Sequence, residues 1–175
     1  MPSLDWREEP ISRQHVRQAF DCGVPELNEY LQRYARQNHE SGGAKTFVAV
    51  QPNDPKRVLG YYTLSPGAIE FARVPQVVRK GLGQYEVPVF RLARLAVDKS
   101  AQGQGLGSQL LLSAGERCLV VAAVVGGVAL AIDAKDERAA QWYEGFGALK
   151  LFDSPRQLVL PLATIAAAIE RGRRT

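Results

Sequence analysis

The spacing of apolar side chains predicts four principal helices. After Pro25, which suits a first helical turn, apolar residues recur at the i, i+3, i+4 and i+7 positions of one helix face. They are Leu27, Tyr30, Leu31, Tyr34 and Ala35. A long apolar run predicts a second helix over 105–125. Asp136 is a good N-cap for a third helix that ends near 145, and the amphipathic stretch 162–169 predicts the fourth.

Runs rich in β-branched and aromatic residues predict strands, with turn-forming residues between them. The predicted strands cover 46–50, 58–64, 88–98, 128–133, 149–153 and 157–160. The 105–125 helix joins the strands 88–98 and 128–133, and a strand–helix–strand connection of this kind favours parallel pairing.

The arrangement of these elements predicts one domain. No repeat, linker or low-complexity tract divides the chain, and 175 residues are enough to bury one core. We therefore expect a single domain over 1–175 of the α+β class, with a mixed central sheet flanked by helices. Residues 1–12 are expected to be extended, Ser12 to cap a short helix or turn over 13–20, and 72–87 to form a loop with a short helix at 75–80.

The composition limits which classes of protein are possible but does not distinguish between folds. Apolar residues make up 46% and charged residues 23%, which is ordinary for a globular chain, and the net charge of +4 mildly favours an anionic partner. Cys22 and Cys118 lie far apart without metal spacing, so we expect thiols in a reducing cytoplasm and no bound metal. The start of the chain shows no apolar leader, and the apolar run 119–132 is too short to span a membrane. We therefore expect no membrane association.

A glycine-rich turn between strand 88–98 and helix 105–125 carries the strongest chemical signal. Gln102–Gly107 has glycines at three alternate positions, which lets backbone N–H groups face one concavity. The free N–H groups and the dipole of the helix that follows also favour negative charge. A dinucleotide fingerprint needs its third glycine one residue later, and a P-loop needs a lysine before Ser108. The turn is therefore predicted to hold a phosphate or pyrophosphate, but not in either of those two ways.

In its setting the turn resembles the acetyl-coenzyme A (acetyl-CoA) loop of the GNAT acyltransferases. The pattern is Gln102-x-x-Gly105-x-Gly107, directly after Arg94-Leu-Ala-Val-Asp98. The segment Ala139-Ala140-Gln141-Trp142-Tyr143-Glu144-Gly145-Phe146-Gly147 resembles the one after the fifth strand in that family, with an altered order at its end. The tyrosine of that segment commonly acts as general acid toward the leaving thiolate, a role that the resemblance gives to Tyr143. Taken alone, a tyrosine on an amphipathic helix is more often a core residue.

A narrower resemblance covers about 10–162. The residues that carry it are Phe20-Asp-Cys-Gly23, Leu27-Asn28, Tyr30-Leu31, Thr46-Phe47-Val48, Tyr61-Tyr62-Thr63-Leu64-Ser65 and Arg94-Leu-Ala-Val-Asp98. They resemble the GNAT toxins of bacterial type II toxin–antitoxin systems. The resemblance implies that the chain uses acetyl-CoA to acetylate the α-amine of aminoacyl-tRNA and so blocks translation. It also implies a ribbon-helix-helix antitoxin that neutralises the toxin, and family members are often homodimers.

The resemblance implies a role for each part of the site. Backbone N–H groups of 102–108 would hold the pyrophosphate, the backbone of Leu95–Val97 the pantetheine arm, and the Val97 N–H the oxyanion. Tyr143 would protonate the thiolate, and attack would be direct, without a covalent enzyme intermediate. Tyr143 and Val97 are thus the predicted catalytic residues. The predicted cofactor-binding residues are Leu95, Ala96, Val97, Gln102, Gly103, Gln104, Gly105, Leu106, Gly107, Ser108, Asp136, Ala140 and Tyr143.

Basic residues are expected to bind the tRNA, and phosphate contacts would make that binding fall with salt. Those in suitable segments are Arg33, Arg36, Lys45, Arg73, Arg79, Lys80, Arg91 and Arg94. Most such residues in a chain of this charge are solvated surface, so a basic groove rests mainly on the resemblance. An α-amine has a pKa of about 8, which the ester lowers further, so much of it is already free base near pH 7 and the use of a dedicated base stays open. Asp136 and Glu144 are the alternative bases.

Two other functions remain open on the sequence. A GNAT enzyme acting on a small-molecule amine or a protein N-terminus would bind acetyl-CoA equally well but leave charged tRNA unmodified. A non-enzymatic module on the same fold would show no turnover with any amine. The presence of both the glycine-rich turn and Tyr143 disfavours that module.

Overall fold

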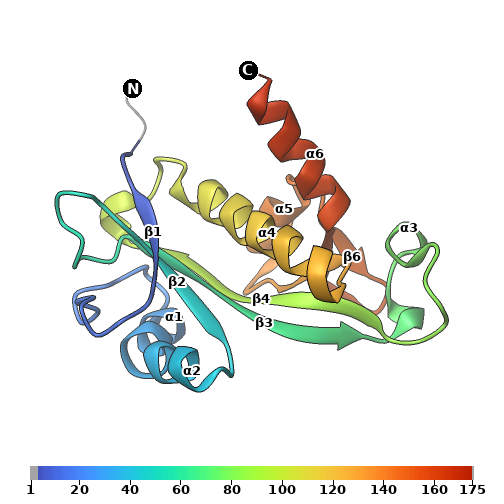
Figure 1. Ribbon diagram of the computed structural model, residues 1–175, viewed down its shortest axis with the longest axis horizontal. Coiled ribbons are helices and arrows are strands. Elements are labelled where there is room, and N and C mark those ends of the chain that lie inside the picture. The colour runs from blue at the N-terminus through green and yellow to red at the C-terminus, as the bar shows by residue number, and fades with distance from the viewer. Residues whose placement is uncertain (1–3, 175) are drawn as a thin grey trace. The chain divides into compact units, whose positions relative to one another are not determined.

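The computed structural model describes residues 4–174, and Figure 1 shows its elements along the chain. In that range seven strands form one sheet in the order β1-β2-β3-β4-β5-β7-β6. The β4–β5 pair is parallel, as the connecting helix predicts, whereas β1–β2, β2–β3, β5–β7 and β6–β7 are antiparallel. The strands are β1 (Arg7–Pro10), β2 (Lys45–Val50), β3 (Gly60–Ile69), β4 (Val87–Val97), β5 (Ala129–Asp133), β6 (Leu149–Leu151) and β7 (Ser154–Pro161). The predicted mixed sheet is confirmed.

The helices follow the predicted periods with one exception. α1 (Pro25–Glu29), a π-helical turn (Tyr30–Tyr34) and α2 (Ala35–Ser41) run on without a break, where the sequence predicts one regular helix. The others are α3 (Gln76–Arg79), α4 (Leu106–Val125), α5 (Glu137–Glu144) and α6 (Leu162–Arg173), with 3₁₀ turns at Phe71–Arg73 and Lys99–Ala101. Of the two alternatives for 13–20 the structure shows turns. Ser12 closes the first of them, with its N–H donating to the His15 ring and its Oγ accepting from the Gln14 N–H.

The chain divides into two compact units. One comprises residues up to Ser65 together with Ala93–Ser113, and the other comprises Pro66–Leu92 together with Ala114 onward. The three changes of unit fall within β3, β4 and α4, so each of these elements contributes to both.

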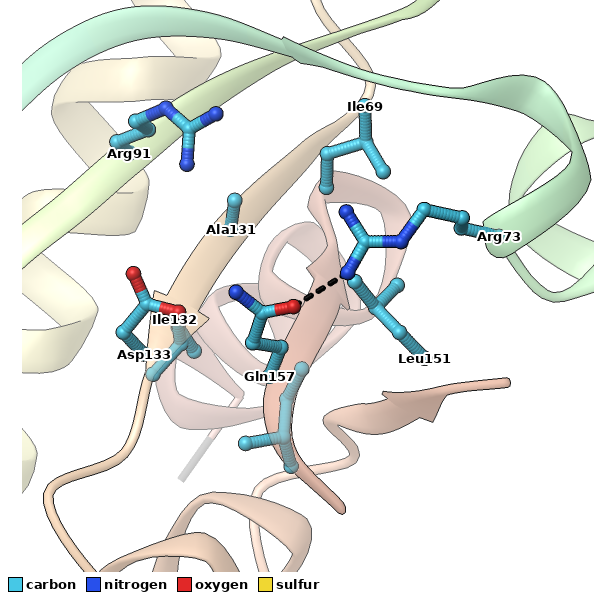
Figure 2. A pocket seen from close by; sticks show the side chains of 9 residues that line it. Ile69, Arg73, Arg91, Ala131, Ile132, Asp133, Leu151 and Gln157 are labelled. Carbon is cyan, nitrogen blue, oxygen red and sulfur yellow. Dashed lines mark hydrogen bonds between the residues drawn. The ribbon is translucent and has the colours of Figure 1, made fainter. Parts of the chain in front are cut away.

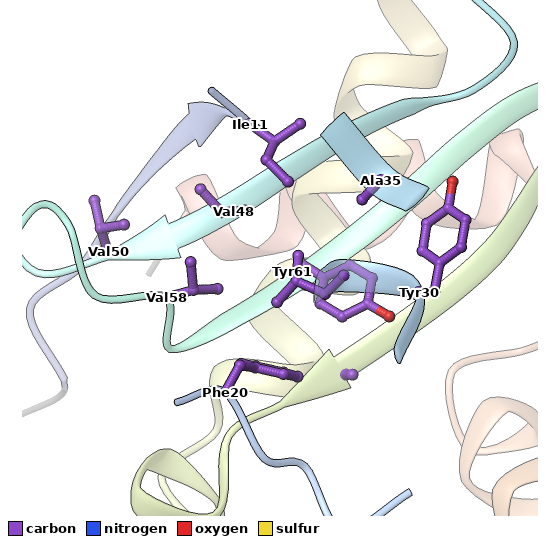
Figure 3. Packing of buried hydrophobic residues seen from close by; sticks show 10 residues of the cluster. Ile11, Phe20, Tyr30, Ala35, Val48, Val50, Val58 and Tyr61 are labelled. Atoms are coloured by element: carbon purple, nitrogen blue, oxygen red, sulfur yellow. The ribbon is translucent and has the colours of Figure 1, made fainter. Parts of the chain in front are cut away.

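The core of the first unit is built around Tyr61 on β3 (Figure 3). Its ring is fully buried and meets Phe20 edge-on, with the ring centroids 5.6 Å apart. Its hydroxyl donates to the Leu27 carbonyl oxygen at 2.6 Å, so the polar tip of this core residue is satisfied and ties α1 to the sheet. Burial raises the pKa of this phenol, so it stays neutral in the core.

The second unit has its own core beneath the segment that precedes β4. Val74 and Val78 are buried there with Val87, Ala129 and Val159. The predicted loop at 72–87 is thus anchored by two valines of its own, although Tyr85 near its end is 83% exposed.

α4 and α6 approach closely in the second unit. A Cβ built on Gly115 of α4 would lie 2.6 Å from Ile165 Cγ2, so a glycine is required at this contact. The last two turns of α4 differ, because Val120, Val124 and Val125 are largely exposed. By length and composition alone α4 could cross a membrane, with 28% of the stretch buried, but core helices also pass this test.

Candidate active site

The glycine-rich turn forms the start of α4 in the first unit. Gly103 and Gly105 have φ angles of +79° and +83°, which only glycine adopts readily, so two of the three predicted glycines are needed for the backbone path. α4 begins at Leu106, and the N–H groups of its first turn have no acceptor within the helix. Exposed backbone over 102–105 leads into this turn, so the geometry suits an anion.

The Gln102 side chain ties the turn to the strand before it. Its Nε2 donates to the Val97 carbonyl oxygen at 2.8 Å and to the Cys22 carbonyl oxygen at 3.0 Å. The first residue of the motif therefore uses its amide inside the protein, and only its backbone remains for a ligand. Sequence reasoning predicts Gln102 at the site but does not reveal this bond to a residue 80 positions away.

Asp98 fixes the end of β4. Its carboxylate accepts hydrogen bonds from Asp21 N at 2.9 Å, Ser100 N at 3.0 Å and Ser100 Oγ at 2.6 Å. Burial opposes ionisation of this carboxyl, but the hydrogen bonds from Asp21 and Ser100 prevail and hold its pKa below the ordinary value. The strand end and the turn are thus held in one conformation.

The exposed edge of β4 lies over Leu95–Val97. Asp98 N donates to the Leu59 carbonyl oxygen at 2.8 Å, which points this N–H toward β3. Because N–H directions alternate along a strand, the N–H groups of Val97 and Leu95 point to the other side. Pairing with β5 on that side extends from Val89 to Leu92. The N–H groups of Leu95 and Val97 therefore lie on the β5 side beyond the end of the β4–β5 pairing, and their roles toward the pantetheine and the oxyanion stay predictions.

Tyr143 belongs to α5 in the second unit. Only 9% of it is exposed, and its ring meets Trp142 edge-on at 4.9 Å between centroids. Burial raises the pKa of the phenol, so Tyr143 keeps its proton and is suited to donate it. The Asp136 carboxylate caps the N-terminus of the same helix by accepting a hydrogen bond from Ala139 N at 2.8 Å. Ala140 is fully buried. The roles of these three residues toward a cofactor stay predictions.

The predicted tRNA-binding residues divide between the two units. In the first, Arg33 and Arg36 are paired with Glu29 and Glu40. Lys45 donates to the His39 carbonyl oxygen, and Arg94 lies 3.6 Å from the centre of the Tyr30 ring. The second unit holds Arg73, Arg79, Lys80 and Arg91. Neither unit alone brings the whole set together, so a single basic groove stays a prediction.

The second unit contains a cavity of about 80 Å³ at the ends of β5 and β7 (Figure 2). Arg73 and Arg91 line it with Asp133 and Gln157, over apolar side chains of the sheet. Arg73 is held by Asp153 at 2.9 Å and also donates to Gln157. Sequence reasoning missed Asp133 and Gln157. The available signal was weak, a single carboxylate at the end of the apolar run 128–132.

Comparison with known proteins identifies the family of this chain. It matches the acetyltransferase (GNAT) domain family over residues 42–147. A tRNA-acetylating toxin of Mycobacterium tuberculosis (strain ATCC 25618 / H37Rv) is 39% identical over 128 residues, which make up 73% of this chain and 75% of the relative.

Solved structures agree with this match. The toxin AtaT complexed with acetyl-methionyl-tRNAfMet is similar in structure, with a TM-score of 0.87 and 28% sequence identity. The aligned region covers 94% of this chain and 99% of the AtaT chain. A second structure is a tyrosine-to-phenylalanine mutant of AtaT bound to the C-terminus of the antitoxin AtaR and to acetyl-CoA. It has a TM-score of 0.80 and 27% sequence identity, and the aligned region covers 95% of this chain and 99% of the mutant chain. The chain therefore belongs to the GNAT acetyltransferase family, in the group of the tRNA-acetylating toxins.

Proposed function

We propose that this protein transfers the acetyl group of acetyl-CoA to the α-amine of aminoacyl-tRNA, and that this blocks translation. The observation that carries the proposal is the 39% identity to a tRNA-acetylating toxin. AtaT in complex with acetyl-methionyl-tRNAfMet supports the choice of amine, because that ligand is an N-acetylated aminoacyl-tRNA.

The chain's own residues suit the steps of this transfer. The backbone N–H groups of 102–108 bind the pyrophosphate of acetyl-CoA, and the β4 edge at Leu95–Val97 pairs with the pantetheine arm. The Val97 N–H stabilises the oxyanion that forms when the amine attacks the thioester carbonyl. The amine attacks the thioester directly, so no covalent intermediate with the enzyme forms. Tyr143 donates its proton to the departing thiolate, the nitrogen loses one proton to solvent, and Tyr143 regains a proton from solvent. Asp136 and Ala140 belong to the same proposed cofactor site.

The partners follow from the same group of proteins. A cognate antitoxin neutralises the enzyme, as the complexes of AtaT with AtaR suggest, and we propose that it is of the ribbon-helix-helix class. We further propose that the enzyme is a homodimer, that it acts in the cytoplasm where charged tRNA is found, and that 1–175 folds as one domain. Arg33, Arg36, Lys45, Arg79, Lys80, Arg91 and Arg94 are the proposed contacts to tRNA phosphates.

Replacement of the proposed general acid tests the mechanism. Tyr143→Phe removes the hydroxyl that protonates the thiolate, and general acid catalysis of this kind contributes about 10²- to 10⁴-fold. We expect a loss of that order in acetylation of aminoacyl-tRNA by acetyl-CoA, measured by mass analysis of the aminoacyl group. Growth arrest on expression should disappear with it.

Tyr85→Phe is the matched control, because Tyr85 is 83% exposed and has no assigned role. It should acetylate tRNA and arrest growth like the wild type. Equal activity of Tyr143→Phe and Tyr85→Phe would remove Tyr143 from the mechanism. If the wild type acetylates a small amine or a protein N-terminus while leaving all charged tRNA unmodified, the alternative acceptor is correct instead.

A further inference from the structure

The cavity in the second unit joins charges of opposite sign on one face of the sheet. Arg91 pairs in register with Ala131, and Asp133 pairs with Gln157. Because side chains alternate along a strand, Ala131 and Asp133 share the face on which Arg91 lies. The methyl group of Ala131 is small, and it leaves the space that Figure 2 shows between the larger polar side chains.

The two arginines of the cavity differ in what they can offer. Arg73 is held by the Asp153 carboxylate and by Gln157, so its charge is already offset and it forms a wall. Among residues 4–174, Arg91 makes one long hydrogen bond, from its Nη2 to the Ala68 carbonyl oxygen at 3.4 Å. Gly67 leaves room for this guanidinium, since a Cβ there would lie 2.6 Å from Arg91 Nε. The donors of Arg91 are therefore placed beside the cavity with little to bind in the protein.

Asp133 is the complementary group. Within the part of the chain that the structure describes, its carboxylate makes no hydrogen bond or ion pair. The uncompensated charges of the cavity are thus one guanidinium and one carboxylate. A simple anion would be repelled by Asp133, and a simple amine would leave Arg91 unused, so the lining suits a ligand that carries both a basic group and an anionic group. In the acceptor of the proposed function these groups are the α-amine and a phosphate.

We propose that this cavity binds the aminoacylated end of the acceptor, with Asp133 accepting from the α-amine and Arg91 binding a phosphate of the 3′-terminal nucleotides. The inference rests on the proposed function and names a recognition site for its substrate. Within this cavity Asp133 contacts the α-amine. Asp133 orients that amine and distinguishes it from an acylated or hydroxyl group.

A non-reactive probe tests the site without turnover. Cytidylyl-(3′→5′)-puromycin carries an amide-linked aminoacyl group with a free α-amine and a phosphodiester, and its analogue has a hydroxyl in place of the amine. Both are titrated against the wild type without acetyl-CoA. A charge-assisted hydrogen bond at a partly exposed site corresponds to about tenfold in affinity. We expect the wild type to prefer the amine by that factor and Asp133→Asn to lose the preference.

The control is Asp54→Asn, an equivalent change at a turn residue that does not line the cavity. It should keep the preference for the amine. Arg91→Gln should weaken both probes to a similar extent and make their binding less sensitive to salt, because the charge pair with the phosphate is lost. The inference is overturned if the wild type does not prefer the amine, if Asp133→Asn keeps the preference, or if Arg91→Gln leaves the salt dependence unchanged.

The proposed function is judged separately. Acetylation of charged tRNA by the wild type supports it, and a wild type that modifies no charged tRNA contradicts it. A wild type that acetylates tRNA but shows no amine preference would remove the role of the cavity and leave the function standing.

Discussion

Gln102 shows how one side chain can support a site without contacting the ligand. Its amide supplies a donor to the Val97 and Cys22 carbonyl oxygens, so it joins the turn, the strand end and the segment before α1. We expect Gln102→Ala to lower the free energy of unfolding by about 1 kcal/mol and to weaken acetyl-CoA binding several-fold. Thermal unfolding and titration with acetyl-CoA measure the two effects.

Gln104→Ala serves as the comparison, because the Gln104 amide makes a long hydrogen bond of 3.4 Å to the Ser100 carbonyl oxygen. This variant should lose little stability. Similar losses in both variants would indicate that the bonds of Gln102 to the two carbonyls contribute nothing specific.

The protonation of Tyr143 has a consequence for the pH dependence of the enzyme. Its pKa is raised by burial, so the phenol keeps its proton at pH values where an ordinary tyrosine, with a pKa of about 10, is half ionised. The catalytic rate should rise as the acceptor amine loses its proton and then stay level through pH 10. An amide-linked aminoacyl-tRNA, which resists alkaline hydrolysis, allows kcat to be measured over this range. A decline with a midpoint below pH 10 would contradict a buried, protonated donor.

At the scale of elements, the π-helical turn between α1 and α2 changes what the helix presents. The Ala35 N–H bonds to the Tyr30 carbonyl oxygen, five residues back, which places both residues in the core while Tyr34 is 49% exposed. The Tyr30 ring, fixed in this way, supports Arg94 of β4. A regular helix fits the apolar spacing equally well, so the sequence predicts the helix and not its wider turn.

The contact of α4 with α6 in the second unit depends on the absence of a side chain. Gly115→Ala would bring its Cβ to 2.6 Å from Ile165 Cγ2, and the helices must separate or Ile165 must move. Overpacking of this kind costs about 1 to 3 kcal/mol, so the melting temperature should fall. Gly172→Ala, on α6 with no atom of the described residues within 4 Å of the new Cβ, should raise it slightly through helix propensity. A melting temperature unchanged by Gly115→Ala would show that this approach of the helices is not tight.

For the molecule as a whole, local patterns predict the elements and long-range contacts decide the site. The glycine turn, the β4 strand and α5 follow from periodicity and from residues that are close in sequence. The cavity could not be predicted in this way, because Arg91, Asp133 and Gln157 come from three strands that only the sheet order brings together. From the sequence alone, Asp133 is interpreted as the polar end of a buried strand, because its neighbours across the sheet are not known.

The passage of the chain between its two units has a consequence for its synthesis. Pro66–Leu92 belongs to the second unit but is made before Ala93–Ser113, which completes the first. At synthesis rates of roughly 5–20 residues per second, the first unit stays unfinished for about 2 to 10 seconds after Ser65 is added. A nascent chain therefore lacks the β4 edge and the glycine turn until late, and Tyr143 comes later still. A nascent copy of this enzyme is thus without its complete set of proposed site residues for most of its own translation.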